Sequence, residues 1–279
     1  MRLAAITAVT ALLATPLFAG GIFDDEHDCK YTAPRNASTP AAGITKVVIH
    51  GESGFLKVDG TAGASQIAVS GTACTSEDDF LNRMTLTLRK SGSELHITAD
   101  IPEKTVIFGF FSARLDFAVT LPAGLPVDIE DGSGMLRVTN TGATEIDDGS
   151  GEIQVRNIRG PLSISDGSGA IDVDTVSGNV EIEDGSGEIS VKNVSGNVEL
   201  EDGSGAILVA KIEGSVLVRE DGSGSIVVKN IRRDLTIDDD GSGGVAVADI
   251  GGNFIVNRKS SGGIDHERVT GRVSVPSKF

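Results

Sequence analysis

The sequence predicts an all-β protein, a single-stranded parallel β-helix of 17–19-residue coils preceded by an irregular N-terminal β cap. The first observation behind this prediction is a repeated Asp-Gly-Ser-Gly turn. It begins at Asp131, Asp148, Asp166, Asp184, Asp202, Asp221 and Asp240. A fixed period of this size is typical of stacked repeats, in which each unit buries its apolar face against its neighbours.

The second observation is the pattern within one period. Residues 186–203 form two nonapeptides, each a Ser-Gly corner followed by alternating aliphatic residues. Alternation with a period of 2 predicts a short strand with one buried face. The inward residues of this coil are Ile189, Val191, Val198 and Leu200, and the outward ones are Glu188, Ser190, Glu199 and Glu201.

The third observation is that equivalent residues of successive coils align in columns. One column holds Ile153, Ile171, Ile189, Ile207, Ile226, Val245 and Ile264, and the next holds Val155, Val173, Val191, Val209, Val228 and Val247. Such β-branched residues suit a pleated wall. A further aliphatic closes one corner of each coil, at Ile158, Val176, Val194, Ile212, Ile231, Ile250 and Val269.

Two other repeat architectures do not fit this spacing. A triangular left-handed helix of hexapeptides needs evenly spaced aliphatics, whereas the gaps around this coil run 2, 3, 4, 2 and 7. A propeller needs repeats of about 40 residues with four strands each. The crossover rule for parallel strands predicts a right-handed β-helix.

The chain divides into four segments. We assign residues 1–19 to a signal peptide, 20–43 to a polar N-terminal segment, 44–125 to a β capping region, and 126–279 to regular repeats continuous with the cap. In the cap we expect strands at 45–49, 84–88, 94–99 and 113–121, and a corner-then-strand phrase at 53–58. Terminal repeats need such a cap to hide the open end of the sheet.

Export is predicted from the first segment. A positive Met1-Arg2 start, an apolar stretch from Leu3 to Phe18 and a cleavage site near Ala19 are typical of a secretory signal peptide. No second long apolar run follows, and no Cys stands at the cleavage point to take a lipid. We therefore expect a periplasmic, secreted or cell-surface protein without a transmembrane segment in its mature form.

The only two cysteines, Cys29 and Cys74, agree with export. A pair of cysteines in an oxidising compartment usually forms a disulfide. We predict that this bond ties the polar segment to the first strands.

Residues 106–111 are the most apolar part of the cap and contain Phe108, Phe110 and Phe111. An apolar stretch of this kind can be a lid over the first coil or an exposed patch for a partner. Both interpretations remain open at the level of sequence.

Residues 113–127 form a strand that ends in Pro-Ala-Gly-Leu-Pro-Val, and Ser-Gly-x-Ile-x-Val corners follow, alternating with x-Val-Ser-Gly-x-Val. In these motifs residues 44–275 resemble the bacterial domain-of-unknown-function family labelled putative adhesin, whose members are similar to auto-transporter adhesin head domains. The resemblance implies interaction at the cell envelope or surface. It implies no catalytic residue.

The acidic turns could be structural or could bind a cation. Stacked carboxylates about 4.8 Å apart repel each other, but bonds from the amides of each turn offset a repulsion of about 1 to 3.5 kcal/mol. The structural interpretation is preferred, and no cofactor is expected; Ca²⁺ is the alternative. The weak candidates for metal ligands are Asp238, Asp240, Ser242 and Asp249, whose spacing imitates a calcium loop without flanking helices.

Catalysis has little support in the sequence. No nucleophile and base occur at a recognisable spacing. Asp172 and Asp174, on the predicted outer wall, keep a polysaccharide-cleaving enzyme as an alternative, but the chain has no Trp and one Tyr to stack on sugars. A net charge of -16 disfavours nucleic acid as a partner.

We therefore predict a non-enzymatic adhesion or binding module whose partner is an envelope or surface protein or a glycan. A structural spacer or scaffold without a specific ligand is the first alternative. The sequence also predicts how the stack ends, because Arg258 and Lys259 replace the acidic pair of the turn one period after Asp239 and Asp240. We expect both cations to lie within about 6 Å of those carboxylates, a spacing at which opposite charges attract appreciably.

Overall fold

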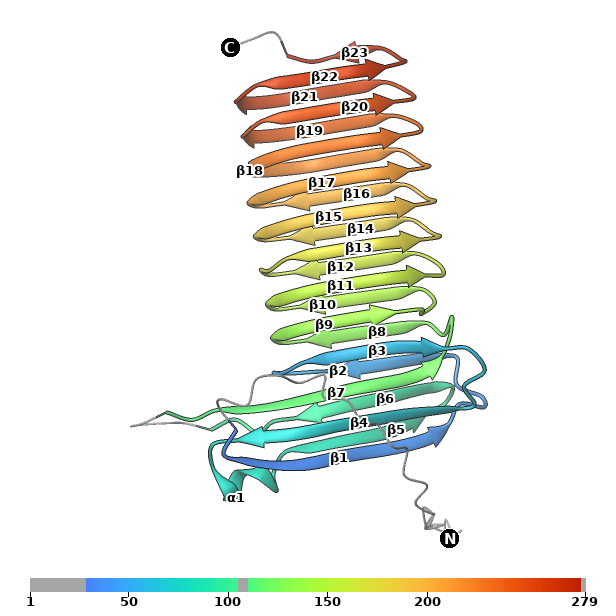
Figure 1. Cartoon of the computed structure of the whole chain (residues 1–279), viewed down its shortest axis with the longest axis vertical. Coiled ribbons are helices and arrows are strands. Elements are labelled where there is room, and N and C mark those ends of the chain that lie inside the picture. The colour runs from blue at the N-terminus through green and yellow to red at the C-terminus, as the bar shows by residue number, and fades with distance from the viewer. Residues whose placement is uncertain (1–28, 105–109, 277–279) are drawn as a thin grey trace, which may run out of the picture.

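The computed structural model describes residues 29–104 and 110–276, which form an elongated stack of flattened β coils above a wider N-terminal cap (Figure 1). The cap and first coils contain β1 (Tyr31–Pro40), β2 (Lys46–His50), β3 (Leu56–Thr61), β4 (Gln66–Thr75), α1 (Asp78–Leu81), β5 (Thr85–Ser91), β6 (Glu94–Asp100) and β7 (Ala113–Pro122). No helix in this part of the chain is long and apolar enough to cross a membrane.

The regular stack begins at Val127. Its strands are β8 (Val127–Asp131), β9 (Gly134–Thr139), β10 (Thr144–Asp148), β11 (Gly151–Ile158), β12 (Leu162–Asp166), β13 (Ile171–Val176), β14 (Val180–Asp184), β15 (Gly187–Val194), β16 (Val198–Asp202), β17 (Gly205–Ile212), β18 (Val216–Ile231), β19 (Leu235–Ser242), β20 (Val245–Ile250), β21 (Phe254–Ser261), β22 (Ile264–Val269) and β23 (Val273–Ser274).

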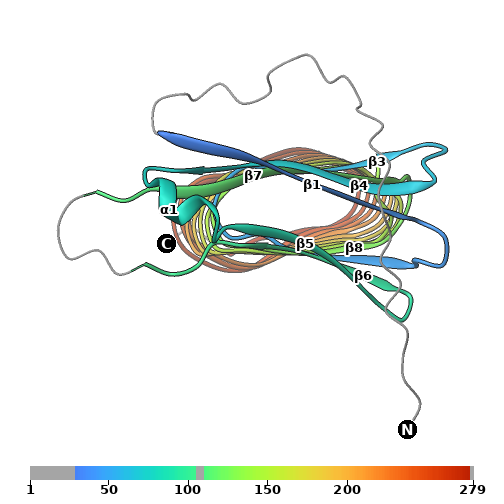
Figure 2. The ribbon, with the colours of Figure 1, turned by 90° about the horizontal axis from the view of Figure 1, so that it is seen from below.

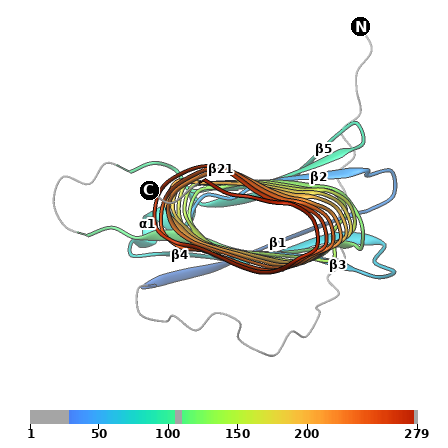
Figure 3. The same cartoon turned by 90° about the horizontal axis from the view of Figure 1, so that it is seen from above.

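The strands form two walls, here called wall A and wall B. Wall A has the spatial order β1-β4-β7-β3-β9-β11-β13-β15-β17-β18-β20-β22. Wall B has the order β5-β6-β2-β8-β10-β12-β14-β16-β18-β19-β21-β23. The long β18 passes through its turn and contributes to both walls. Viewed along the stack, successive coils superimpose as flattened ovals (Figure 3).

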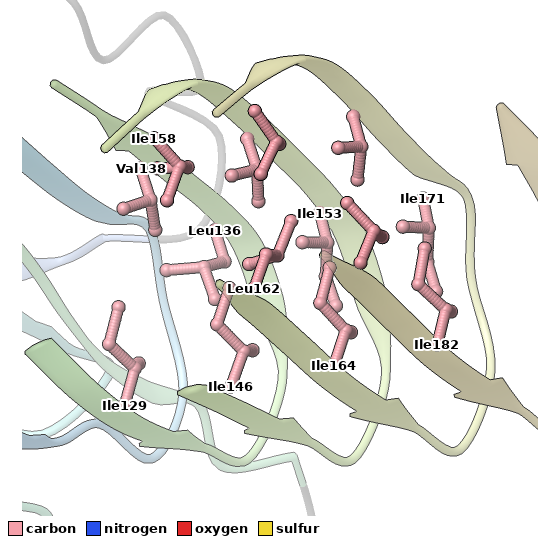
Figure 4. Close-up of a cluster of buried hydrophobic side chains, with 14 of the residues drawn as sticks. Ile129, Leu136, Val138, Ile146, Ile153, Ile158, Leu162, Ile164, Ile171 and Ile182 are labelled. Atoms are coloured by element: carbon pink, nitrogen blue, oxygen red, sulfur yellow. The ribbon is translucent and has the colours of Figure 1, made fainter. Parts of the chain in front are cut away.

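The predicted parallel β-helix is confirmed, and so is its inward alternation. Every pairing from β8 onward is parallel, and each coil pairs with the equivalent residues of the next. Leu136, Ile153 and Ile171 stack on wall A and face Ile129, Ile146 and Ile164 on wall B (Figure 4). All six are at most 3% exposed. The core is therefore one continuous aliphatic column.

The first coil is built out of sequence order. Strands β2 and β3 lie between the β6–β7 coil and the β8–β9 coil, so the chain leaves the stack after β3 and returns to it at β8. The strands formed during this excursion, β4 to β7, lie beneath the stack (Figure 1). This arrangement makes the cap and the helix one continuous structure.

The cap ends the sheet with antiparallel strands. β4 pairs with β7, β1 pairs with β4, and β5 pairs with β6. Figure 2 shows β1, β4 and β7 on one long side of the open end, β5 and β6 on the other, and α1 at one end between them. Arg35 of β1 connects the sides, because its Nε and Nη2 donate to the carbonyls of Met84 and Leu81 at 2.9 and 2.7 Å. Edge strand β1 also carries Pro34 and Pro40, which limit pairing with another chain.

The expected cap strands agree with β2, β5, β6 and β7 to within three residues at their ends, and β3 covers the end of the corner phrase. Two strands were not foreseen. β1 lies in the segment described from the sequence only as polar, and β4 lacks a continuous aliphatic pattern over Gly71–Thr75. Their antiparallel partners supply the hydrogen bonds that the sequence pattern does not reveal.

The predicted disulfide is present. Cys29 and Cys74 are bonded, with their Cα atoms 5.4 Å apart, just where β1 begins and β4 ends. We expect thiol labelling of the denatured protein, taken from an oxidising compartment, to modify no cysteine before reduction and two after it. Two reactive thiols without reductant would contradict the pairing.

Candidate functional site

The corner between each wall A strand and the following wall B strand has a left-handed backbone. Eight residues other than glycine have φ between 53° and 65°, one per coil: Asn140, Asn157, Thr175, Asn193, Lys211, Asn230, Asp249 and Arg268. Asn and Asp tolerate this conformation best, whereas Thr, Lys and Arg are held in it at a cost of about 1 to 3 kcal/mol each. The corner aliphatic that follows is buried in each coil from Ile158 to Ile250, and it fixes the turn.

This corner is hollowed in the upper half of the stack. A groove of about 930 Å³ runs across it and is lined by Asn193, Val194, Ser195, Lys211, Ile212, Glu213, Asn230, Ile231, Arg232, Asp249, Ile250, Gly251, Arg268 and Thr270. The corner aliphatics form its floor and are at most 1% exposed. The accessible lining therefore consists of amide, hydroxyl and charged side chains. We call this feature the corner groove.

Two ion pairs cross the corner groove from one coil to the next. Arg232 pairs with Glu213, and the Arg268 Nη2 atom lies 2.9 Å from Asp249 Oδ2. The Arg268 guanidinium holds the pKa of Asp249 below its usual value. Lys211 lies among these groups, so the groove has an excess of positive charge on a chain of net charge -16.

The carboxylates proposed for an enzyme belong to an ion-pair network on the outer face of wall A. Asp172 receives hydrogen bonds from Arg156 at 2.5 and 3.2 Å, and Lys192 Nζ lies 3.7 Å from both Asp172 and Asp174. The Arg156 bond lowers the pKa of Asp172. Partial burial would raise the pKa of Asp174, but bonds from Asn193 and Thr175 outweigh it and lower that pKa. General acid catalysis needs a raised carboxyl pKa, so this pair suits structure better than catalysis.

The aspartates of the repeated turns point into the core. All seven, from Asp131 to Asp240, are at most 7% exposed, and they form one register column along wall B. We call them the inner aspartate column. In Asp166, Asp184 and Asp202 the Oδ1 atom accepts from the amide of the turn Ser two residues later at 2.9 to 3.2 Å. The hydrogen bond from a turn amide to the Asp side chain, expected from the sequence, is thus confirmed in these coils. The burial of the carboxylates was not expected from the sequence.

Every member of the inner aspartate column has at least one buried carboxylate oxygen without a hydrogen-bond partner. In Asp131, Asp166, Asp184 and Asp202 the buried Oδ2 has no hydrogen bond, and in Asp148 and Asp221 neither oxygen has one. Burial, followed by the charges of neighbouring aspartates, raises the pKa of Asp131 and Asp221 to about 7. Burial is also the main cause that raises the pKa of Asp148 and Asp184 to about 6.

The column ends as the sequence predicts. Lys259 occupies the next position in register after Asp240, and its buried ammonium binds Asp240 Oδ2 and the Gly243 carbonyl, the latter at 2.9 Å. Arg258 Nη2 lies 2.9 Å from Asp239 Oδ2 on the surface. The prediction that these cations lie near the last acidic pair is confirmed. At the other end the column stops at Gly51, which has no side chain to meet Asp131.

The calcium-loop candidates do not come together around one point. Asp240 is bound to Lys259 in the core, Asp238 accepts from Asn257 Nδ2 at 2.7 Å, and Asp249 is held by Arg268 in the corner groove. Ser242 lies in register with Ser223 and Ser261. Within residues 29–104 and 110–276, no cluster of three or more His, Cys, Asp or Glu has the arrangement of a metal site. The spacing resembled a calcium loop because the coil repeat contains the same Asp and Gly positions.

Phe110 and Phe111 have different environments. Phe111 packs against the core, its ring 4.7 Å from that of Phe80 in an edge-on contact and with Lys104 Nζ 4.5 Å above it. Phe110 is fully exposed, and Phe108 lies outside the described residues. Phe111 therefore packs within the cap beside α1, and a partner contact remains a proposal for Phe110.

Sequence reasoning missed the corner groove, although a signal existed. The left-handed residue of this corner is Asn in four of the eight coils, and a periodic Asn at a turn is typical of a left-handed backbone.

A family model described as Toastrack DUF4097 matches residues 44–261. No curated protein matches the chain in sequence.

Three solved structures are similar in topology at low identity. A putative cell adhesion protein from Clostridium sporogenes is 13% identical over 86% of this chain and 100% of its own, with a TM-score of 0.32. A putative adhesin from Bacteroides fragilis is 12% identical over 88% of this chain and 97% of its own, with a TM-score of 0.39. A putative adhesin from Parabacteroides merdae is 11% identical over 86% of this chain and 95% of its own, with a TM-score of 0.37.

Proposed function

The chain belongs to the Toastrack DUF4097 family, and on that premise we propose that it is an exported, non-enzymatic binding module of the cell envelope or surface. Its ligand lies in the corner groove and is an extended hydrophilic chain, a glycan or a polar protein segment. The single observation that carries this proposal is the groove itself, which repeats similar polar groups on successive coils. Residues 1–19 and the Cys29–Cys74 disulfide support export, because disulfides persist in oxidising compartments.

The lining of the groove favours this class of ligand. Its accessible groups are Asn, Ser, Thr, Lys, Arg, Asp and Glu side chains, and no aromatic residue is among them. Groups on neighbouring coils are about 4.8 Å apart, as strands in a sheet are. A ligand with repeated polar groups can therefore bind several coils at once. Weak contacts that act together in this way give a larger combined affinity.

The test compares two variants that lose the same charge from the same part of the stack. K211N/R232Q changes the groove, and Asn suits the left-handed position of residue 211. R219Q/K229N is the control and removes one arginine and one lysine outside the groove lining. The arginines are matched, since Arg219 pairs with Glu199 as Arg232 pairs with Glu213. All four side chains are exposed, so both variants should have the melting temperature of the wild type.

Immobilised protein comprising residues 20–279 is probed with a glycan array and with extracted envelope proteins. We expect the groove variant to bind the retained ligand with an affinity lower by on the order of tenfold, a loss of about 1.4 kcal/mol of binding free energy. The control variant should bind it with the affinity of the wild type. Equal binding by all three proteins would contradict a site in the groove. A wild type that retains nothing would favour a structural spacer.

A further inference from the structure

The inner aspartate column has no role in the proposed binding module, and its chemistry is unusual. It places seven carboxyl groups, one per coil, in a core that is mostly apolar. Neighbouring members are in direct register on adjacent parallel strands, as Asp166 is with Asp184 and Asp184 with Asp202. Adjacent strands lie about 4.8 Å apart, so each carboxyl group has another above and below it.

The irregular coils preserve this register. The step from Asp202 to Asp221 is 19 residues, one more than each of the three steps before it, and the extra residue would turn Asp221 outward in a regular strand. Instead, the strand register shifts after Leu200, so that no residue of β16 lies opposite Arg219 and Asp221 is still in register with Asp202. The fold therefore keeps the inward aspartate even where the coil length changes.

The unpartnered oxygens show what the column lacks. In Asp166, Asp184 and Asp202 a turn amide donates a hydrogen bond to Oδ1, and Oδ2 is buried without a donor. An ionised carboxylate is very costly to bury in this form, whereas a protonated one is neutral and becomes a donor itself. A proton on one Asp can be donated to the free oxygen of the next, as in paired catalytic aspartates that share one proton.

We propose that the inner aspartate column is a proton-binding site, in which carboxyl groups of successive coils share protons through carboxyl–carboxylate hydrogen bonds and make the stability of the solenoid depend on pH. The upper end of the column supplies its own cation, the Lys259 ammonium on Asp240. Farther from Lys259, toward Asp131, protons take the place of that ammonium.

Few other charges face the column. On its own strands the neighbouring acidic side chains alternate outward, at Glu130, Asp147, Glu183, Glu201, Glu220 and Asp239. The wall A strands that follow the turns present buried aliphatics, such as Ile189 and Ile207. In the cap, the buried acid Asp116 is bound by Arg114 and the Phe55 amide at 3.1 and 2.8 Å. Apart from the column's own members, Asp147 and Lys259 are the charges that act on it.

The direction of the pH dependence follows from burial. In the folded protein the pKa of four members is raised from 3.8 to about 6 or 7. At pH values between the unfolded pKa of 3.8 and the folded pKa of about 6 or 7, the folded column binds more protons than the unfolded chain. The free energy of unfolding therefore falls as the pH rises. The stability is fully present below about pH 4 and is lost as the pH rises through about 6 to 7.

Urea unfolding of the mature protein from pH 4 to pH 8 tests the proposal with two matched pairs of variants. D184N and D202N place a permanent amide donor in the column, and E183Q and E201Q remove the same charge one residue earlier on the exposed face. The Asp184 pKa of about 6 against 3.8 corresponds to roughly a 100-fold rise in the unfolding equilibrium constant over this range. We expect D184N to remove that rise and E183Q to keep it.

Proton release on unfolding provides a second measurement that does not depend on any variant. Potentiometric titration of wild type during unfolding at pH 6 should show release of protons from the folded protein. Release of none, or a pH dependence that D184N and D202N leave unchanged, would overturn the proposal. A stabilisation at pH 8 by ten degrees or more in millimolar CaCl₂ or KCl would also overturn it, because a cation would then occupy the column.

Discussion

Replacing Gly205 with alanine should destabilise the protein by about 4 kcal/mol or more, among the largest effects of any single substitution. Gly205 has φ of 150° and pairs directly with Gly187 of the coil below. A Cβ atom at Gly205 would lie 2.6 Å from the Gly187 carbonyl carbon and would overlap its oxygen. Both groups belong to the backbone, so the clash can be relieved only by separating the two coils.

The matched control is G244A, another glycine in the same kind of turn. A Cβ atom at Gly244 would meet no atom within 4 Å. Urea unfolding should place G244A within about 1 kcal/mol of wild type. For G205A, hydrogen exchange should show lost protection between β15 and β17 first. Equal stability of the two variants would mean that the coils are not packed as closely as the structure has them.

Replacing Lys259 with methionine should cost about 3–5 kcal/mol at pH 8, because it leaves the buried carboxylate of Asp240 without its counterion. The ammonium and the carboxylate are each 1% exposed in their side chains. Amide protection should disappear first from Gly244 onward, in the coils that the pair closes.

The neighbouring variant R258M is the control for this substitution. Arg258 pairs with Asp239 but is 75% exposed, and exposed ion pairs contribute at most about 1 kcal/mol. A K259M protein as stable as R258M at pH 8 would show that the buried pair does not close the column.

Much of the stack could be predicted because its pattern of buried and exposed residues repeats from coil to coil. The alternation that buries Val198 and Leu200 also places Asp202, two residues later, on the inner face. The sequence therefore contained the burial of the aspartates, but a charged residue in a turn is normally assigned to solvent. Lys259 could be placed correctly from register alone, because it falls one period after Asp240.

The cap was harder to predict for two physical reasons. β2 and β3 contact strands that come much later in the chain, so their neighbours cannot be found from a repeat length. β1 alternates between half-buried and exposed residues without any buried one, and it is held by hydrogen bonds to β4 and by Cys29 instead of an aliphatic face. The corner groove was missed because it depends on backbone conformation at Lys211 and Arg268, which do not favour it by themselves.

Infrared spectroscopy at pH 6 tests most directly whether protons reside on the inner aspartate column. An ordinary aspartate, with a pKa of 3.8, is almost fully ionised at that pH. We predict that the wild type shows the carbonyl stretching band of protonated carboxyl groups, that D184N/D202N weakens this band, and that E183Q/E201Q leaves it unchanged. A wild-type spectrum at pH 6 without that band would show that the buried carboxylates are ionised and would contradict the shared-proton column.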